Sequence, residues 1–384
     1  MKTSDHAPGP RATCSTPERH PDPVVKIRDI AYLEFDRTDP TTAAAFFEDF
    51  GLRVVERRGE RTYLRAAGTD HHCVVLRRAR RNAHTAVGFY ADNAADLQRL
   101  AALTGATAVE EIQEPGGGRR VSLRGPDGIR VDVIHGRSLL NEIGPSRLTE
   151  TNTVRPGGDL ARVNETVRIS NGPARPYRLG HTVQSARDVD RTIRWYQEHL
   201  GLIVSDFQFA DGVPEVLTAF MRCDRGATPT DHHTVAIGFG PVVGHLHSAF
   251  ECHDLDDLMA GHVHLRDQRR RHSWGIGRHM LGSQIFDYWR DPAGDMFEHY
   301  ADGDRFDSSK TAEYCLVRPR DSHHQWGPPM TRDFLGLSPD LLLRDLPEIV
   351  GRFLDREDPL TPWKLRCMAQ DMNTSQKFFK PARS

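Results

Sequence analysis

The sequence predicts a mixed α+β protein with two domains, each built from two similar units of strand, helix and several strands. Two observations lead to this fold class. The chain has 384 residues, which exceeds what a single hydrophobic core usually serves. The tetrapeptide Thr-Asp-His-His also occurs twice, in TDHHCVVLRR (69–78) and in TDHHTVAIGF (230–239), and this recurrence indicates an internal duplication.

The opening segment of each half supports the duplication. IAYLEFDRTDPTTAAAFFEDFGLRVV (30–55) runs in step with GHTVQSARDVDRTIRWYQEHLGLIVS (180–205) at an offset of 150. Each segment is typical of an apolar strand, a polar turn, an amphipathic helix, a Gly-Leu stop and a second strand.

Later segments repeat as well. At an offset of 161, TAVGFYADNAADL (85–97) matches LHSAFECHDLDDL (246–258), and both are typical of a strand followed by a helix. At an offset of 166, GPDGIRVDV (125–133) matches DPAGDMFEH (291–299), and both favour two strands joined by a tight Pro-x-Gly turn. Four units in two paired domains are therefore expected.

Composition shifts along the chain predict the domain boundaries. The expected parts are a disordered Pro-rich lead-in (1–24), a first domain (25–137), a linker (138–177), a second domain (178–303) and a C-terminal extension (304–384). Within the extension, SPDLLLRDLPEIVGRFLD is predicted to be helical.

Bulk properties narrow the function classes. With 51 basic and 53 acidic residues, the chain has no global field to hold a nucleic acid. No run of 18 apolar residues and no secretory signal is present, so we expect a cytoplasmic protein without a membrane span. Six scattered cysteines without a CxxC spacing argue against a disulfide framework or a thiolate zinc site.

Comparison of the two halves isolates a candidate metal site. The aligned positions, with the second half first, are His181 and Ala31, His247 and Ala86, and Glu298 and Asp132. Only the second half keeps all three potential ligands. Two imidazoles and a carboxylate are the ligand set of non-haem Fe(II) oxygenases, because they leave three metal positions open for substrate and dioxygen.

A second histidine competes for one of these positions. His245 precedes His247 in GHLHSAF, and we expect the two side chains to point to opposite faces of a strand, so that only one lines the cavity. His247 is preferred because of its register with Ala86 and because the apolar pair Ala249 and Phe250 follows it.

At these residues the sequence resembles the type I extradiol ring-cleaving dioxygenases, the catechol 2,3-dioxygenase and dihydroxybiphenyl dioxygenase group of the vicinal oxygen chelate superfamily. The motifs RLGHTV, DHHTVAIG, HLHSAFE and GRHMLGSQIFDYWRDPAGDMFEHY occur in the family's order. The resemblance covers about residues 27–303, and in the first half it rests on the fold pattern, which agrees with the family's metal-free amino-terminal domain.

The resemblance implies paired βαβββ modules and a metal ion, Fe(II) or more rarely Mn(II), held by His181, His247 and Glu298. It implies that His233 is the acid-base residue, with a pKa near that of a free imidazole, while His232 points the other way. His279 would contact the substrate, and Tyr288 would hydrogen-bond a substrate hydroxyl. His72, the counterpart of His233, would face a cavity without ligands and would serve in packing or as a polar surface residue.

The activity implied is meta-cleavage of a catechol with O2 as co-substrate, in the catabolism of aromatic compounds, by a homo-oligomer. A monocyclic, a fused-ring and a carboxylated catechol all remain open. Arg278, in the basic run RDQRRRHSWGIGRH, is a candidate ligand for a ring carboxylate, because guanidinium pairs with carboxylate in a bidentate manner.

Three alternatives remain at this point. A glyoxalase-like metal lyase or isomerase shares the fold but usually assembles its site from two modules, commonly with two carboxylates. A metal-free protein that sequesters an aromatic drug needs no complete ligand triad. A zinc hydrolase is the third.

Overall fold

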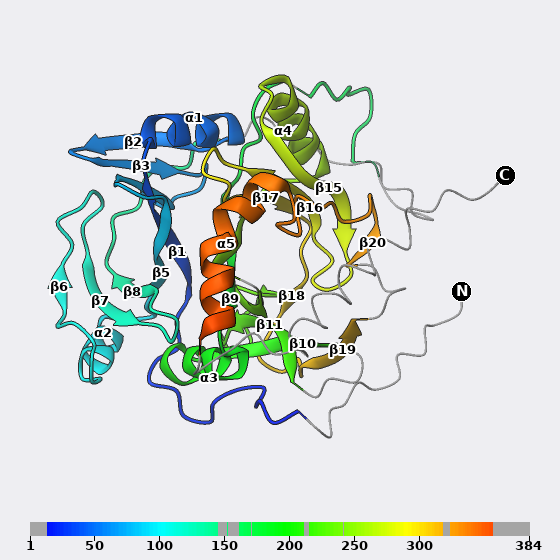
Figure 1. The fold of residues 1–384 in the computed structure, drawn as a ribbon. Coiled ribbons are helices and arrows are strands. Elements are labelled where there is room, and N and C mark those ends of the chain that lie inside the picture. Colours follow the sequence, from blue (N-terminus) through cyan, green and yellow to red (C-terminus); the bar gives the residue numbers. More distant parts are fainter. Residues whose placement is uncertain are drawn as a thin grey trace.

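Each half of the chain folds around one β-sheet. The computed structural model describes residues 14–144, 152, 161–169, 171–210, 215–240, 242–317 and 323–355. The two sheets lie beside each other, with the first at the left of Figure 1 and the second at its centre and right. The predicted α+β class is confirmed.

The first sheet has eight strands in the order β2-β3-β4-β1-β5-β8-β7-β6. Its elements are β1 (Asp29–Arg37), α1 (Pro40–Phe50), β2 (Arg53–Arg58), β3 (Arg61–Arg65), β4 (Val74–Arg78), β5 (Ala83–Tyr90), α2 (Ala94–Ala101), β6 (Glu110–Glu111), β7 (Arg119–Arg124) and β8 (Arg130–His135). Two βαβββ units meet where β1 pairs with β5 in antiparallel fashion.

The second sheet repeats this plan in the order β19-β10-β11-β13-β9-β14-β17-β16-β15-β20. Its two units comprise β9 (Arg178–Ala186), α3 (Val189–Leu200), β10 (Leu202–Ala210), β11 (Val216–Cys223), β13 (Val235–Phe239), β14 (Gly244–Glu251), α4 (Leu255–Asp267), β15 (Arg271–His279), β16 (Ile285–Arg290) and β17 (Met296–Ala301). The remaining elements are β12 (Thr230–Asp231), β18 (Arg305–Phe306), β19 (Glu313–Val317), β20 (His324–Trp326) and α5 (Pro339–Leu354). The four predicted units are therefore present.

The Gly-Leu stops act as helix C-caps. Gly51 ends α1 with φ 108°, and Gly201 ends α3 with φ 68°. Glycine adopts this left-handed conformation without the steric cost that a Cβ brings, so the chain can leave the helix at once and enter the next strand. At the other ends, Asp39 and Asp188 accept hydrogen bonds from the first turn of each helix.

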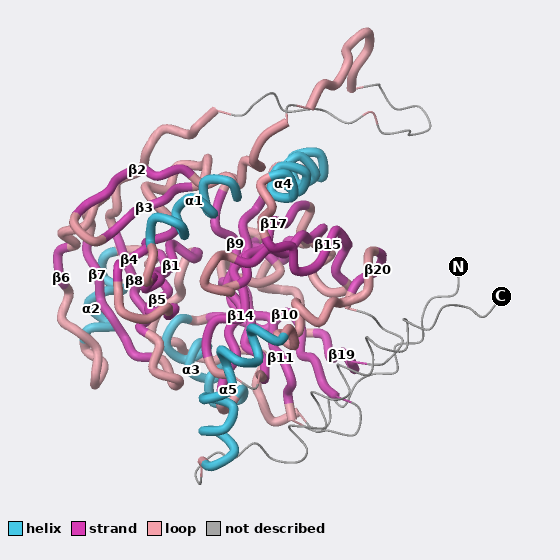
Figure 2. Tube along the Cα trace, turned by 45° about the horizontal axis from the view of Figure 1, so that its top comes forward, coloured by secondary structure: helices cyan, strands magenta, loops and turns pink. Residues whose placement is uncertain are grey.

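The two halves share one hydrophobic core. Phe297 on β17 packs edge-on against Phe35 on β1 and Phe47 on α1. A buried ion pair joins Arg37 to Asp291, with 2.8 Å between Nη2 and Oδ2. Figures 1 and 2 both place α1 beside α4, in agreement with the contacts between these helices. These contacts pack the first half against the second.

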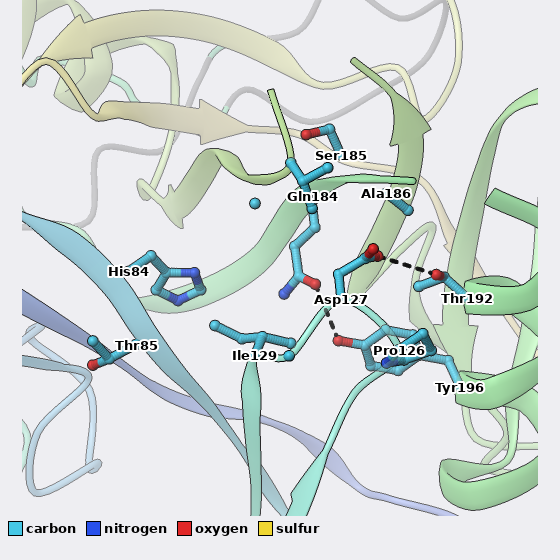
Figure 3. A pocket seen from close by; sticks show the side chains of 13 residues that line it. His84, Thr85, Pro126, Asp127, Ile129, Gln184, Ser185, Ala186, Thr192 and Tyr196 are labelled. Atoms are coloured by element: carbon cyan, nitrogen blue, oxygen red, sulfur yellow. Dashed lines mark hydrogen bonds between the residues drawn. The ribbon is translucent and has the colours of Figure 1, made fainter. Parts of the chain in front are cut away.

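A cavity of about 330 Å³ lies at the boundary between the halves (Figure 3). His84 from β5 and Gln184 from β9 point into it, next to Asp127 from the turn between β7 and β8. It contains none of the three predicted ligands, since the side of β9 that carries Gln184 faces away from the second-half cavity described below.

The ends of the chain differ from the expectation in part. Residues 14–24, expected as disordered lead-in, lie along α3, where Gln197 Nε2 donates to Pro17 O at 2.7 Å and Val24 N donates to Glu198 O at 2.7 Å. The predicted helix in the extension is confirmed as α5. Residues 1–13 and 356–384, and much of the predicted linker, lie outside the described residues.

Within the described ranges, no helix is long and apolar enough to cross a bilayer. The proposed domain boundaries remain a prediction.

Candidate metal centre

Two of the predicted ligands lie in one row across adjacent strands. His181 on β9 pairs with Ala249 on β14, Ala249 pairs with Glu298 on β17, and Glu298 pairs with Tyr288 on β16. Residues paired across a sheet project from the same face. Because Ala249 carries only a methyl group, space remains between imidazole and carboxylate. His247, two residues before Ala249, projects into this space from the same face.

The three side chains converge on one point. His181 Nε2 lies 3.3 Å and His247 Nε2 3.4 Å from the same oxygen of Glu298, Oε2. Their ligand atoms all lie within 4.8 Å of one another. His181 and His247 line a cavity of about 250 Å³, and Glu298 is fully buried beside it.

The donor set fits a divalent metal ion. Among the described residues, neither oxygen of the buried Glu298 carboxylate has a hydrogen-bond partner, which is costly for a charged group unless a cation is bound. Burial alone would raise the pKa of Glu298, but the imidazoles of His181 and His279 outweigh it and hold that pKa well below its usual range. Burial lowers the pKa of His247 to about 3, so this imidazole is neutral and able to coordinate.

His245 is turned away from the cavity, but for a reason that differs from the expectation. Side chains two residues apart in a regular strand lie on the same face. The reason expected for the separation of His245 and His247, simple alternation along the strand, was therefore wrong. A β-bulge between them rotates His245 to the opposite side. There its ring packs against Phe35 of the first half at 5.1 Å and His84 at 5.0 Å between centroids.

The second copy of Asp-His-His borders the cavity through His233. This residue precedes β13, lines the cavity, and has its ring centroid 4.0 Å from that of His181. Its Nδ1 lies 3.0 Å from Nδ1 of His232, whose Nε2 hydrogen-bonds the Asp206 carboxylate. Burial and four neighbouring imidazoles lower the pKa of His233 well below its ordinary value. The expectation of an ordinary imidazole pKa was therefore wrong, and His233 is neutral.

Tyr288 and His279 lie together on the other side of Glu298. The Tyr288 hydroxyl and His279 Nε2 are 2.7 Å apart, and His279 Nε2 lies 3.6 Å from Glu298 Oε1. Burial, followed by the Glu298 charge, raises the pKa of Tyr288 well above its ordinary value, so the phenol keeps its proton.

Arg278 is the one predicted site residue that is not brought to the cavity. It neighbours His279 on β15, so its side chain leaves from the opposite face. Its guanidinium donates to Ser283 O at 2.6 Å and to Asp302 Oδ2 at 2.8 Å. These contacts hold it away from any substrate.

Strand register corrects one of the aligned pairs. In the first sheet, Tyr32 pairs with Gly88, Gly88 with Asp132, and Asp132 with Ser122. This row corresponds to His181, Ala249, Glu298 and Tyr288, so the counterpart of His181 is Tyr32 and the alignment to Ala31 was wrong by one residue. A Cβ at Gly88 would lie 2.2 Å from Tyr32 Cε1, so glycine makes room for the phenol.

His72 occupies in the first half the position that His233 holds in the second half. It is 2% exposed, and its ring lies 5.0 Å from that of Tyr63 and 6.0 Å from that of Tyr32. The position that an ion would need is taken by aromatic side chains. Packing was one of the two roles expected for His72, and its burial against these aromatic rings agrees with that role.

Two residues near the centre were missed from the sequence. Asp206 is the only acid in the apolar strand segment LIVSDFQF, which was a usable signal. Trp274 pairs with Tyr288 in register and stacks on it at 9° between the ring planes. No motif in the sequence distinguished Trp274 from an ordinary core residue.

Comparison with known proteins finds similar sequences. Residues 178–299 match the Glyoxalase/Bleomycin resistance protein/Dioxygenase superfamily. The chain is 28% identical over 313 residues to "Metapyrocatechase 2" of Cupriavidus necator, covering 80% of this chain and 92% of the relative. It is 23% identical over 325 residues to "Iron-dependent extradiol dioxygenase" of Rhodococcus jostii, covering 79% and 97%.

Two solved structures share the fold. The Mn(II)-bound glyoxalase from Novosphingobium aromaticivorans has a TM-score of 0.65 at 24% identity, covering 79% of this chain and 91% of the other. Homoprotocatechuate 2,3-dioxygenase from Brevibacterium fuscum, in complex with 3,4-dihydroxyphenylacetate, has a TM-score of 0.66 at 21% identity, covering 83% and 94%. Residues 178–299 are thus similar to the Glyoxalase/Bleomycin resistance protein/Dioxygenase superfamily, and the chain is a homologue of a protein named metapyrocatechase.

Proposed function

We propose that this protein is an extradiol dioxygenase that opens the ring of a catechol beside its vicinal diol and inserts both atoms of O2. The observation that carries the proposal is the buried Glu298 carboxylate, which has no hydrogen-bond partner in the described part of the chain and faces two imidazole nitrogens at 3.3 and 3.4 Å. The names of the two relatives support the same reaction.

The metal we propose is Fe(II), with Mn(II) as the alternative, held by His181, His247 and Glu298. A relative named as iron-dependent supports the first, and a neighbour of the same fold with bound Mn(II) supports the second. When bound, the divalent ion lowers the pKa of the diol hydroxyls and brings the diol and dioxygen side by side.

His233 is proposed as the acid-base residue. As a neutral imidazole it can accept a proton from a substrate hydroxyl and return it later in the reaction. If Asp206 accepts the Nε2 proton of His232, then His232 Nδ1 accepts from His233 Nδ1. This arrangement leaves Nε2 of His233 free to take the proton.

Tyr288 and His279 are proposed to orient the ring. Tyr288 keeps its proton and can donate it in a hydrogen bond to a substrate oxygen, as charge develops there. In the structure His279 Nε2 accepts the Tyr288 proton at 2.7 Å, because His279 Nδ1 donates to His323 O at 3.1 Å; a bound substrate oxygen would replace Nε2 as the acceptor. Both side chains line the cavity, and Glu298 lies between them and the two histidine ligands.

Oxygen uptake tests the proposal directly. Fe(II)-loaded protein prepared without oxygen is given catechol, 3-methylcatechol, 2,3-dihydroxybiphenyl or 3,4-dihydroxyphenylacetate, and uptake is followed with absorbance. One O2 per diol and a yellow product are expected. A glyoxalase-like lyase or isomerase consumes no O2, so absent uptake with iron bound would contradict the proposal.

His247 and His245 provide a matched pair of variants. They lie two residues apart on β14, but only His247 lines the cavity. His247→Ala should lose bound iron and all uptake, whereas His245→Ala should keep one iron per chain and its uptake. Equal iron loss in both variants would contradict the ligand assignment.

We also infer that the protein forms a homo-oligomer. On α5, six apolar side chains at least 41% exposed share one side of the helix: Leu342, Leu343, Leu346, Val350, Phe353 and Leu354. Exposed apolar surface of this kind is typical of protein interfaces. Sedimentation of the wild type should give a multimer, and Leu346→Glu should shift it towards the monomer; an unchanged monomeric wild type would contradict the inference.

A further inference from the structure

The cavity beside the three predicted ligands has a largely apolar lining. Its volume is about 250 Å³. The apolar side chains come from β15, the turn that follows it, and the segment after β20; six of them are Trp274, Met280, Leu281, Met330, Phe334 and Leu335. Apart from the predicted ligands, His233, His279 and Tyr288, the polar side chains of the lining are Gln208, Thr218, Gln284 and His323.

Three of these apolar residues belong to residues 327–337, which we call the cap. The cap is attached to β15 and β16 through Asp333, whose carboxylate accepts from Arg290 Nε at 2.6 Å and from Arg271 Nε at 2.7 Å. Trp274 Nε1 also donates to Pro328 O at 2.8 Å. Two arginines on one carboxylate fix the cap in place, so its side chains form a preorganised wall.

The cap lies beside the group proposed to bind a substrate hydroxyl. The Phe334 ring centroid is 5.0 Å from that of Tyr288 and 4.6 Å from that of Trp274. Met330 is 7% exposed and packs in the same cluster as Tyr288. A diol that reaches Tyr288 therefore brings its ring substituents against these apolar side chains.

This surface favours one class of diol. Each methylene buried against it strengthens binding by roughly fourfold. A carboxylate there would lose its hydration, and the described lining offers it no lysine or arginine, only the imidazole of His323 outside the proposed reaction groups. We propose that the substrate is a catechol with an uncharged alkyl or aryl substituent, selected by Met330, Phe334 and Leu335; this inference rests on the proposed ring cleavage.

Binding without turnover tests the substrate class. Fe(II)-loaded protein is titrated under nitrogen, by calorimetry, with 3-methylcatechol, 2,3-dihydroxybiphenyl and 3,4-dihydroxyphenylacetate. At least one of the two uncharged diols should bind about tenfold or more tightly than the acid, given the cost of an unpaired buried carboxylate. Equal or tighter binding of 3,4-dihydroxyphenylacetate would overturn the inference.

Leu335→Arg places a cation in the cap. The variant should weaken the uncharged diols and strengthen the acid, each by about tenfold, because guanidinium pairs with carboxylate. The control is Leu139→Arg, after β8 of the first half, where the leucine is 61% exposed, and it should change neither affinity. Identical behaviour of the two variants would overturn the role of Leu335.

Two further measurements keep the outcomes separate. If Leu335→Arg melts below the wild type, Leu335→Ala replaces it and should weaken only the uncharged diols, by several-fold. Oxygen uptake is recorded on the same samples. The predicted binding order without oxygen uptake would support the substrate class and reject ring cleavage. Oxygen uptake with the reverse binding order would support ring cleavage and reject the substrate class.

Discussion

The Tyr32 hydroxyl donates a hydrogen bond of 2.5 Å to the Asp132 carboxylate, and this pair occupies the positions that His181 and Glu298 hold in the second half. Ser122 donates to the other oxygen of Asp132 at 2.6 Å. Protein donors thus satisfy the Asp132 carboxylate in the first half, whereas the Glu298 carboxylate in the second half has no hydrogen-bond partner within the described ranges. The carboxylate of the first half is therefore already paired within the protein, whereas the Glu298 carboxylate is available to a bound cation.

Removal of the Tyr32 hydroxyl should affect stability alone. Tyr32→Phe leaves the buried Asp132 short of one donor and should lower the free energy of unfolding by about 1 to 2 kcal/mol. The control Tyr177→Phe removes an exposed phenol bonded to Glu142 and should cost about 0.5 kcal/mol or less. Denaturant melts measure both. A changed iron content in Tyr32→Phe would contradict the assignment of the first half as metal-free.

Substitution of His233 should separate turnover from metal binding. His233→Gln keeps a polar group of similar size but cannot take and return a proton, so kcat should fall by about 10² to 10⁴-fold. Iron content should stay at one per chain, because His233 is not among the three proposed ligands. The exposed His253 supplies the control His253→Gln, with unchanged kcat. Loss of iron in His233→Gln would mean that His233 is a ligand.

Tyr288→Phe tests the proposed contact with the substrate. The ring and its packing on Trp274 remain, and only the hydroxyl bonded to His279 is lost. One hydrogen bond to a developing charge should be worth about 1.5 to 3 kcal/mol, so kcat/KM should fall by about ten- to a hundredfold. Tyr314→Phe, which removes a hydroxyl bonded to Glu18, should leave kcat/KM unchanged. A loss confined to the melting temperature would make Tyr288 structural.

Asp287 on β16 predicts a pH-dependent stability. Its carboxylate projects to the side opposite Tyr288, where His262 Nδ1 lies at 3.0 Å and His272 Nε2 at 2.8 Å. Burial alone would raise the pKa of Asp287, but the hydrogen bonds from these imidazoles lower it below its ordinary value. A depressed folded-state pKa stabilises the protein above the unfolded pKa, and this contribution is lost as pH falls through the folded pKa.

Asp287→Asn should therefore cost about 2 kcal/mol at pH 7, and the gap to the wild type should narrow below about pH 4. Asp302→Asn, at a carboxylate that is 70% exposed, should cost less than about 0.5 kcal/mol at either pH. Chemical denaturation at pH 7 and at about pH 2.5 measures the difference. A gap that widens in acid would contradict the sign of this shift.

Most of the fold was predictable from the chain because its signals are local. The Gly-Leu stops at Gly51 and Gly201, the Pro-x-Gly turns and the alternating strands recur in both halves, and recurrence raises the weight of each weak signal. The helix in the extension was predictable from its apolar spacing for the same reason. The contacts of residues 14–24 along α3 were not, because they depend on distant partners.

The sequence by itself determined which residue types could hold a metal and which half could hold it, since residue identity limits the available ligands. Only the tertiary structure decided the rest. Strand register replaced Ala31 with Tyr32 as the counterpart of His181, a bulge separated His245 from His247, and alternation along β15 removed Arg278 from the cavity. Each outcome depends on a shift of a single residue. In a β-strand such a shift reverses the face on which a side chain lies, and only pairing with neighbouring strands fixes it.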